Sequence, residues 1–449
     1  MRKVLKWLAG SAIALIASAA AWLAVSPPEL LRIGDAYAAK IVCSNVFLAG
    51  RNASQVLSED VQAPGNPLLR FIRVSVDDAR KSVTARIFGF AAPGHAIYRE
   101  GLGCTTVADG DFSAFPGNRQ LRRRSGPGDE TKPWPEGDGV VPEPALQSVV
   151  QNDTLAGPGI RGLVVVRNGR IVAERYGEGF NRNTPLLGWS MTKTVTAALI
   201  GLRIRDGRMA LDRTELMPQW RNDPRNSIKL SDLMGMQSGL EFNEDYGSVT
   251  DVTRMLFLEG DMAGFAADKP LVAAPGKNFS YSSGTSTLLS HLWMQTFDST
   301  REALVFPRVT LFRPLGMNSA VLEPDAHGTF VGSSYMYATA RDWARFALFL
   351  LRGGRWNDQQ ILPEGYVDFM RTPTSASKGA YGEGQVWTEG PGNKAIDLPG
   401  DAYWMQGHDG QTVMIVPSLD LAVVRLGLTP SSLGYDVRTL DAEIIKAIR

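Results

Sequence analysis

Two short apolar runs at the start of the region 142–449 constrain its fold more than any other feature of the sequence. Residues 162–166 and 171–176 are rich in Val and Ile, and the segment between them contains Asn168-Gly169. Asn-Gly supplies the two positive-φ residues that a type I′ turn requires. The region therefore opens with a predicted β-hairpin.

A second hairpin is predicted near the C-terminus, where the apolar runs 412–416 and 421–426 flank a Pro-Ser-Leu-Asp turn. Residues from 436 onward have the pattern of a closing helix, and most of the chain between the hairpins is helical in pattern, with Gly- and Pro-rich loops. This order predicts an α/β (α+β) fold: one antiparallel sheet flanked by helices, with a mostly helical lobe. We expect a binding site in the cleft between sheet and helices.

The chain before this region divides into three further segments. Residues 71–76, 82–90 and 96–99 alternate in the manner of strands, which predicts a small N-terminal β-rich extension. A shift to Gly, Pro and charged residues then indicates a linker. The predicted organisation is an export signal or membrane anchor (1–39), a β-rich unit (40–110), a linker (111–141) and the main domain (142–449).

The extreme N-terminus has the pattern of an export signal. Arg2, Lys3 and Lys6 precede an uncharged, mostly apolar stretch at residues 7–25. Because this stretch approaches the ~20 residues that span a bilayer, we expect an uncleaved anchor in the inner membrane and a periplasmic body. The alternative is cleavage after Ala36-Tyr37-Ala38, which has the small-x-small form, and a soluble exported protein.

Export also gives a role to the two cysteines, Cys43 and Cys104. In an oxidising compartment they are expected to form a disulfide, the alternative being two unrelated buried thiols. Closing a loop of about 60 residues would stabilise the fold by about 4 kcal/mol on the chain-entropy model. We expect the bridge to stabilise the β-rich unit independently of catalysis.

The charge balance argues against nucleic acid as a partner. The chain has 47 basic and 46 acidic residues, whereas phosphate binding needs clustered excess Lys and Arg. The arginines at 122–124 lie in the Pro- and Gly-rich linker and are interpreted as solvated. His95, His291 and His327 are scattered without metal-ligand spacing, so neither a metal nor a cofactor is expected.

A Ser-x-x-Lys motif, Ser190 to Lys193, opens the apolar helical run 194–200. Lys193 lies one turn along the same helix face and can reach the Ser190 hydroxyl. A serine becomes a good nucleophile when a neighbouring base takes its proton, and the helix N-terminus favours negative charge at Ser190. By itself Ser190 could equally be a helix N-cap. A second copy of the motif, Ser375 to Lys378, opens no apolar helix.

Ser-x-x-Lys at the start of a helix resembles the nucleophile motif of class C β-lactamases, penicillin-binding peptidases, related esterases and 6-aminohexanoate-dimer hydrolases. The second motif of that family, a Tyr-Ser-x after Pro-Gly, is matched by Tyr281-Ser282-Ser283 after Pro275-Gly276. The third, a Lys/His-x-Gly beside the cleft, is matched by His408-Asp409-Gly410, directly before the strand 412–416. The resemblance spans roughly residues 145–449 and implies a β-lactamase-like fold.

The resemblance also implies the role of each residue. Ser190 would be acylated, Lys193 would take or share its proton, and Tyr281 would protonate the leaving group and later activate water. The backbone N–H groups of Ser190 and Gln411 would form the oxyanion hole. His408 would orient the substrate or tune Lys193 and Tyr281, and Asp409, Gly410, Ser283 and Tyr335 are candidate substrate-binding residues.

Two departures from the family bear on the substrate. Ser283 stands where lactam-binding members often have Asn, and His408-Asp409 stands where they have Lys-Thr. The partner we expect is therefore a small ester or linear amide without an essential carboxylate. The alternatives are a peptidase or β-lactamase acting on cell-wall-type substrates, and a penicillin-binding sensor that is acylated without turnover.

Overall fold

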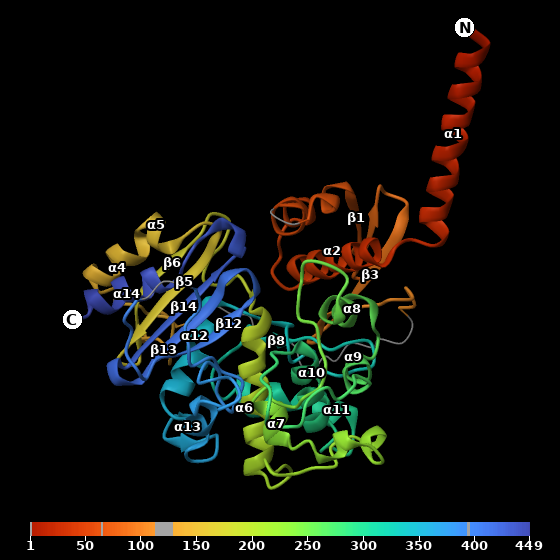
Figure 1. Ribbon diagram of the computed structural model, residues 1–449. Coiled ribbons are helices and arrows are strands. Elements are labelled where there is room, and N and C mark those ends of the chain that lie inside the picture. The colour runs from red at the N-terminus through yellow and green to blue at the C-terminus, as the bar shows by residue number, and fades with distance from the viewer. Residues whose placement is uncertain (1, 64–65, 113–128, 393–395) are drawn as a thin grey trace. The chain divides into compact units, whose positions relative to one another are not determined.

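The computed structural model (Figure 1) describes residues 2–63, 66–112, 129–392 and 396–449. Half of the predicted linker, including the arginines at 122–124, lies outside these residues. The chain forms two compact units. The N-terminal unit contains Met1–Arg99, Gly103–Gly117 and Glu244–Gly260, and the large unit contains Glu100–Leu102, Asn118–Asn243 and Asp261–Arg449.

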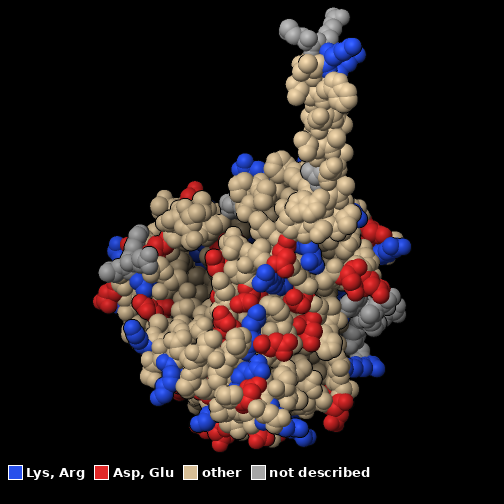
Figure 2. Space-filling view, turned by 45° about the vertical axis from the view of Figure 1, so that its right-hand side comes forward, with Lys and Arg blue, Asp and Glu red and all other residues tan. Residues whose placement is uncertain are grey.

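The N-terminal unit begins with an apolar helix, α1 (Arg2–Val25). Its large apolar side chains are exposed, as in Trp7 and Ile16, whose exposed fractions are 79% and 70%. In Figure 2 the helix is tan along most of its length and blue near its N-terminal end. The segment Lys3–Val25 is long and apolar enough to cross a membrane.

The remainder of this unit is a four-stranded antiparallel sheet in the order β1-β2-β3-β4, covered by helix α2 (Glu29–Phe47). Gly94 permits this packing, because a Cβ at that position would lie 2.2 Å from the Ala36 backbone nitrogen. The strands are β1 (Ile72–Asp77), β2 (Ser82–Ile87), β3 (Ala91–Arg99) and β4 (Gly103–Thr106). The short helices are α3 (Ala53–Val56), η1 (Leu57–Gln62), η2 (Pro67–Phe71) and α8 (Asp251–Leu258).

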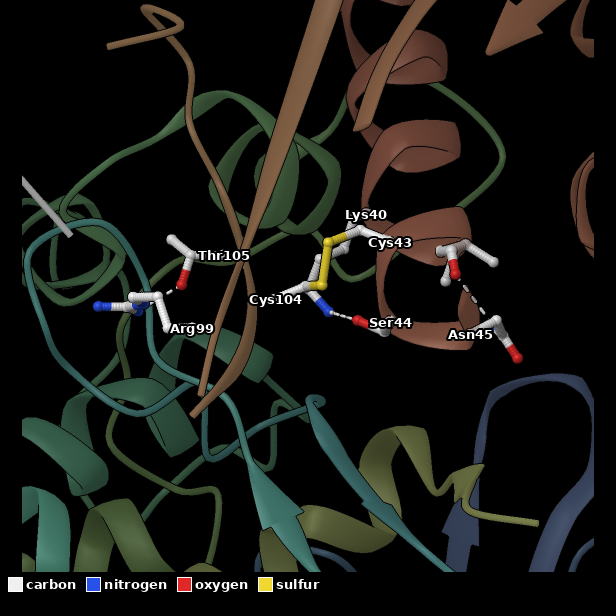
Figure 3. Close-up of a disulfide and its surroundings, with 8 residues drawn as sticks. Lys40, Cys43, Ser44, Asn45, Arg99, Cys104 and Thr105 are labelled. Atoms are coloured by element: carbon white, nitrogen blue, oxygen red, sulfur yellow. Dashed lines mark hydrogen bonds between the residues drawn. A yellow bond between two sulfur atoms is a disulfide. The ribbon is translucent and has the colours of Figure 1, made fainter. Parts of the chain in front are cut away.

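The expected disulfide joins Cys43 of α2 to Cys104 of β4, and both cysteines are fully buried. Beside it, the buried amine of Lys40 donates a hydrogen bond to Ser44 Oγ, one helical turn away (Figure 3). The bridge therefore ties the helix to the last strand of the sheet.

Helix α2 was not predicted from the sequence, which placed an export signal or membrane anchor over residues 1–39 and a β-rich unit from residue 40. Its small residues, such as Ala36 and Ala38, are buried, and small side chains show their helical packing role only beside a partner such as Gly94. The motif Ala36-Tyr37-Ala38, the cleavage site of the alternative prediction, thus lies inside a packed helix.

The large unit is built on a five-stranded antiparallel sheet in the order β12-β13-β14-β5-β6 (Figure 1). Both predicted hairpins are present, and β14 pairs with β5, which joins the two ends of the region in one sheet. The strands are β5 (Ile160–Arg167), β6 (Arg170–Tyr176), β12 (Tyr403–Gly407), β13 (Gln411–Val416) and β14 (Leu421–Gly427).

Helices cover both faces of this sheet. Leu163 and Val165 of β5 pack in one core with residues of α4 (Pro144–Gln151) and the closing helix α14 (Arg438–Ala447). The alternating Val164 is also fully buried, so the opposite face is covered as well, and α12 (Ala340–Leu351) contacts β5 and β14.

The predicted helical lobe lies between the hairpins in the chain and supplies most of the candidate site. Its helices include α6 (Thr192–Arg205), α7 (Leu230–Met234), α9 (Met262–Ala267), α10 (Ser283–Met294), α11 (Thr300–Pro307) and α13 (Tyr366–Arg371). A small sheet, in the order β7-β9-β8, is formed by β7 (Leu186–Leu187), β9 (Met336–Ala338) and β8 (Val321–Leu322). These observations confirm the predicted α/β (α+β) architecture, one antiparallel sheet flanked by helices with a mostly helical lobe.

Candidate active site

Ser190 lies in a tight turn, Trp189–Met191, that leads directly into α6. The turn is held close to its surroundings: Gly188 N–H donates to Met336 O at 3.0 Å, and a Cβ on Gly188 would lie 2.3 Å from the Trp343 ring. Trp189 has a φ of +47°, which is rare for a bulky residue and indicates local strain. Ser190 itself is half-buried.

The amine of Lys193 connects three parts of the large unit. Its Nζ lies 2.9 Å from Ser190 Oγ, 3.0 Å from Ser283 Oγ and 3.1 Å from the backbone oxygen of Ser333. Lys193 is 1% exposed. A lysine held in this way has its nitrogen aimed at the serine hydroxyl, which is the geometry that proton transfer between the two requires.

Tyr281 faces the same amine from the segment before α10. The centroid of its ring is 4.8 Å from Lys193 Nζ. The next residue, Ser282, caps α10 by accepting a hydrogen bond from Thr285 N–H, and this cap sets the chain direction between Tyr281 and Ser283. As a result, Tyr281 lies over Lys193 while Ser283 binds it.

Aromatic side chains pack around Tyr281. Its ring centroid is 5.1 Å from that of Trp387 and 5.8 Å from that of Tyr381. Phe279 packs against the same two rings. Phe279, Tyr281, Tyr381 and Trp387 are called the aromatic wall below.

The turn His408–Gly410 connects β12 to β13. His408 is 38% exposed and packs edge-on against Trp189, with centroids 5.5 Å apart, while its Nε2 is 3.4 Å from an Asp409 carboxylate oxygen. Asp409 has a φ of +57°, and burial raises the pKa of its carboxyl above the usual range. This turn is thus strained and polar beside the Ser190 turn.

The Gln411 side chain holds the turn in place. Its amide donates to the backbone oxygens of His408 and Asp409 at 3.1 Å and accepts from Gly427 N–H at 2.9 Å. Gly410 O accepts from the buried Arg425. At the end of β12, a Cβ on Gly407 would lie 2.2 Å from Gly188 O, so this strand end lies directly against the Ser190 turn.

The structure therefore brings together Ser190, Lys193, Tyr281 and Ser283, and places His408 beside them through Trp189. Ser283 is fully buried, and Tyr335 is buried with its ring 6.3 Å from Trp189. The second motif copy is different, because Ser375 precedes no helix and Lys378 has a φ of +56°. Among the described residues, no cluster of His, Cys, Asp or Glu could hold a metal ion.

Ser333 O and Trp387 also belong to this site, and neither was predicted from the sequence. Ser333 is 140 positions from Lys193 in the chain, and it contributes a backbone oxygen, which any residue type has. The one feature of the sequence that could have indicated Ser333 is the preceding glycine, Gly332. In the structure, a Cβ at Gly332 would lie 2.0 Å from Ser290 Oγ, so only glycine fits there. A glycine before two serines marks a close chain approach only once the fold is known.

Comparisons with known proteins show relatives in sequence and in fold. The sequence profile of the beta-lactamase family matches residues 152–443. A 6-aminohexanoate-dimer hydrolase of Paenarthrobacter ureafaciens is 22% identical over 290 residues, which cover 60% of this chain and 72% of that protein.

Two solved structures have a similar fold. A Bacillus anthracis protein assigned as a 6-aminohexanoate-dimer hydrolase has a TM-score of 0.54 and 25% identity, over 65% of this chain and 79% of that one. A penicillin-binding protein of Bacillus halodurans has a TM-score of 0.51 and 17% identity, over 68% and 98% of the two chains.

Proposed function

The chain belongs to the beta-lactamase family, and from this premise we propose that it is a serine hydrolase that forms an acyl-enzyme on Ser190. The observation that carries the proposal is the position of Lys193 Nζ, 2.9 Å from Ser190 Oγ and 4.8 Å from the centre of the Tyr281 ring. A nucleophile and a base are thereby within hydrogen-bond distance, and the ring that carries the second proton donor lies over the base.

In the proposed reaction, Ser190 Oγ attacks a carbonyl carbon while Lys193 takes the hydroxyl proton. The leaving group departs with a proton from Tyr281, and water then hydrolyses the acyl-serine with the same groups acting in reverse. The negative oxygen of each tetrahedral intermediate would accept hydrogen bonds from the backbone N–H groups of Ser190 and Gln411. Losing one such donor typically lowers the rate by about 10²–10³.

We further propose a small ester or linear amide as substrate. Ser283, which replaces the Asn of lactam-binding members, is fully buried and hydrogen-bonded to Lys193, and it lacks the side-chain amide that would bind the side-chain carbonyl of a lactam. His408-Asp409 replaces Lys-Thr, which removes the lysine cation that would meet a substrate carboxylate and puts the Asp409 carboxyl beside that position. The aromatic wall favours an apolar substrate segment beside Tyr281.

A fluorophosphonate probe followed by mass spectrometry tests the nucleophile. We expect one adduct, on Ser190, and none in Ser190→Ala. Ser375→Ala is the matched control, because it removes the serine of the second Ser-x-x-Lys copy and should leave labelling unchanged. An adduct on another residue, or one that persists in Ser190→Ala, refutes the assignment.

Turnover separates the proposed esterase from its rivals. With p-nitrophenyl acetate we expect a burst followed by steady hydrolysis. A burst without turnover would instead favour an acylated sensor, and labelling by fluorescent penicillin would favour a cell-wall-type substrate.

We also propose that α1 remains attached as a membrane anchor, with the large unit outside the cytoplasm. Cleavage after Ala38 would remove the first ten residues of α2, including the part that packs against Gly94. The chain should therefore resist extraction from membranes by alkaline carbonate and retain its N-terminus. A soluble product that starts at residue 39 would contradict the anchor.

A further inference from the structure

A row of exposed aromatic rings lies at one end of the sheet of the N-terminal unit. Phe71, Phe88 and Phe90 have exposed fractions of 48%, 47% and 47%. Ring centroids are 5.2 Å apart for Phe71 and Phe88 and 6.4 Å apart for Phe88 and Phe90. Single exposed apolar side chains are ordinary, whereas a contiguous group of large ones marks a contact surface.

The backbone conformation at Phe88 is unfavourable for a phenylalanine, so the stability of the fold does not explain why this residue type is present. In the turn between β2 and β3, φ is +55° at Phe88 and +80° at Gly89. Asn, Asp or Gly is the favoured residue at the first of two such positions, and a bulky side chain there is strained. Strain that persists at an exposed position is typical of a binding surface.

The aromatic row lies close to the point where the chain leaves α1. Phe88 N–H donates to Phe71 O at 2.9 Å, and the adjacent Ile87 N–H donates to the Asp35 side chain in α2 at 2.9 Å. Helix α2 begins at Glu29, and α1 ends at Val25. Asp35 is therefore about 9 Å along α2 from its first residue. Because Ile87 binds Asp35, the aromatic row lies near the end of the unit where α1 joins it. The end of the unit that carries α1 in Figure 1 also contains β3, which α1 contacts.

The charged residues of this end are suited to phospholipid. Arg32, Arg70 and Arg73 are exposed, while the acidic Glu29 is paired with Arg254 at 2.7 Å. Aromatic rings favour the interface between headgroups and acyl chains, and arginines beside them bind lipid phosphates.

We propose that this end of the N-terminal unit docks on the bilayer that α1 crosses, with Phe71, Phe88 and Phe90 in the headgroup region. Arg32, Arg70 and Arg73 bind the phosphates of anionic lipids. The inference goes beyond the hydrolase and requires only the anchor. The N-terminal unit is then held by two contacts, the span and the docked surface, and does not turn freely about Pro27-Pro28.

Spin labelling of the full chain in phosphatidylglycerol-containing nanodiscs tests the docking. A nitroxide on Phe90→Cys should collide with oxygen more often than with a water-soluble nickel chelate. Asp78→Cys is the matched control, because Asp78 lies in the turn between β1 and β2, at the opposite end of the same sheet. The oxygen-to-nickel ratio should be at least several-fold higher for Phe90→Cys.

A second variant separates docking from folding. Phe88→Asn places Asn-Gly in a turn that prefers it, so the unit should remain folded while the Phe90 label becomes more accessible to nickel. Leu433→Asn, at an exposed apolar position of the large unit, should leave that label unchanged. Equal ratios at residues 78 and 90, or a chain that fails to float with lipid vesicles, would overturn the proposal.

Discussion

At the scale of single residues, the Tyr281 hydroxyl can be tested apart from its ring. Tyr281→Phe keeps the packing against Trp387 and Tyr381 and removes only the group proposed to donate a proton. We expect kcat to fall by about 10²–10⁴, the usual contribution of a positioned acid or base, with the melting temperature unchanged.

The control is Tyr435→Phe, which removes a hydroxyl that donates to Leu155 O in the large unit. It should lower stability by about 1 kcal/mol and leave kcat within about two-fold, the opposite pattern. A Tyr281→Phe variant with wild-type kcat would exclude the hydroxyl from the reaction.

Asp441 gives a pH prediction at the same scale. Burial raises the pKa of this carboxyl to about 7, and Trp404 Nε1 donates a hydrogen bond to it at 3.5 Å. Between the ordinary pKa of aspartate and about 7, the folded chain keeps a proton that the unfolded chain has lost. Stability should therefore fall as pH rises through this window, by up to about 1.4 kcal/mol per pH unit.

Asp441→Asn keeps a neutral polar group and removes this titration. In urea unfolding at pH 5 and pH 7.5, the variant should lose less stability between the two pH values than the wild type does. Asp35 contributes a dependence of the same sign in the N-terminal unit, since burial raises its pKa to about 7 as well. Equal losses in both proteins would show that Asp441 is not protonated in the folded state.

The residues of the candidate site show how far prediction from sequence reaches. Ser190, Lys193 and Tyr281 belong to motifs with fixed order and spacing, so the sequence indicates them before any fold is known. Ser333 and Trp387 are found only in the structure, because their roles depend on where distant segments of the chain meet Lys193 and Tyr281.

At the scale of elements, the contact between β12 and the Ser190 turn is sensitive to one methyl group. An alanine at Gly407 would place its Cβ 2.2 Å from Gly188 O, so one of the two backbones must move. We expect Gly407→Ala to lower kcat/KM by about 10²-fold, as small displacements of catalytic groups do, and to cost about 1–3 kcal/mol of stability.

Gly400→Ala is the matched control, because Gly400 precedes the same strand and a Cβ there meets no atom within 4 Å. It should leave both quantities unchanged. If Gly407→Ala hydrolyses an ester at the wild-type rate, the strand end does not position the Ser190 turn.

Element prediction succeeded where the pattern is local. The hairpin of β5 and β6 follows from alternating apolar residues around Asn-Gly, and the structure has φ values of +50° and +72° at Asn168 and Gly169. Helix α2 was missed because its first half resembles the end of an export signal. Its packing partner is Gly94, about sixty positions away, and no local pattern reports that contact.

At the scale of the whole molecule, the chain leaves the large unit after Asn243 and returns at Asp261. The segment between them belongs to the N-terminal unit, where Arg254 pairs with Glu29, 225 positions away. No local pattern of residues predicts this exchange of segment 244–260 between the units, since it is defined by long-range contacts. It raises the question of whether the stability of the N-terminal unit affects hydrolysis in the large unit.

Removing the disulfide of the N-terminal unit tests whether its stability affects hydrolysis. Cys43 and Cys104 are 61 positions apart, and removing a bridge that closes such a loop should destabilise the N-terminal unit by about 4 kcal/mol. In the double variant Cys43→Ala and Cys104→Ala, hydrogen exchange should accelerate in α2 and β1–β4 but not in β5 or β13. Ester hydrolysis should persist, because each contact that defines the candidate site joins residues of the large unit. If hydrolysis is lost while exchange in β5 and β13 is unchanged, then the segment 244–260 transmits the state of the N-terminal unit to Ser190, and the two units do not act independently.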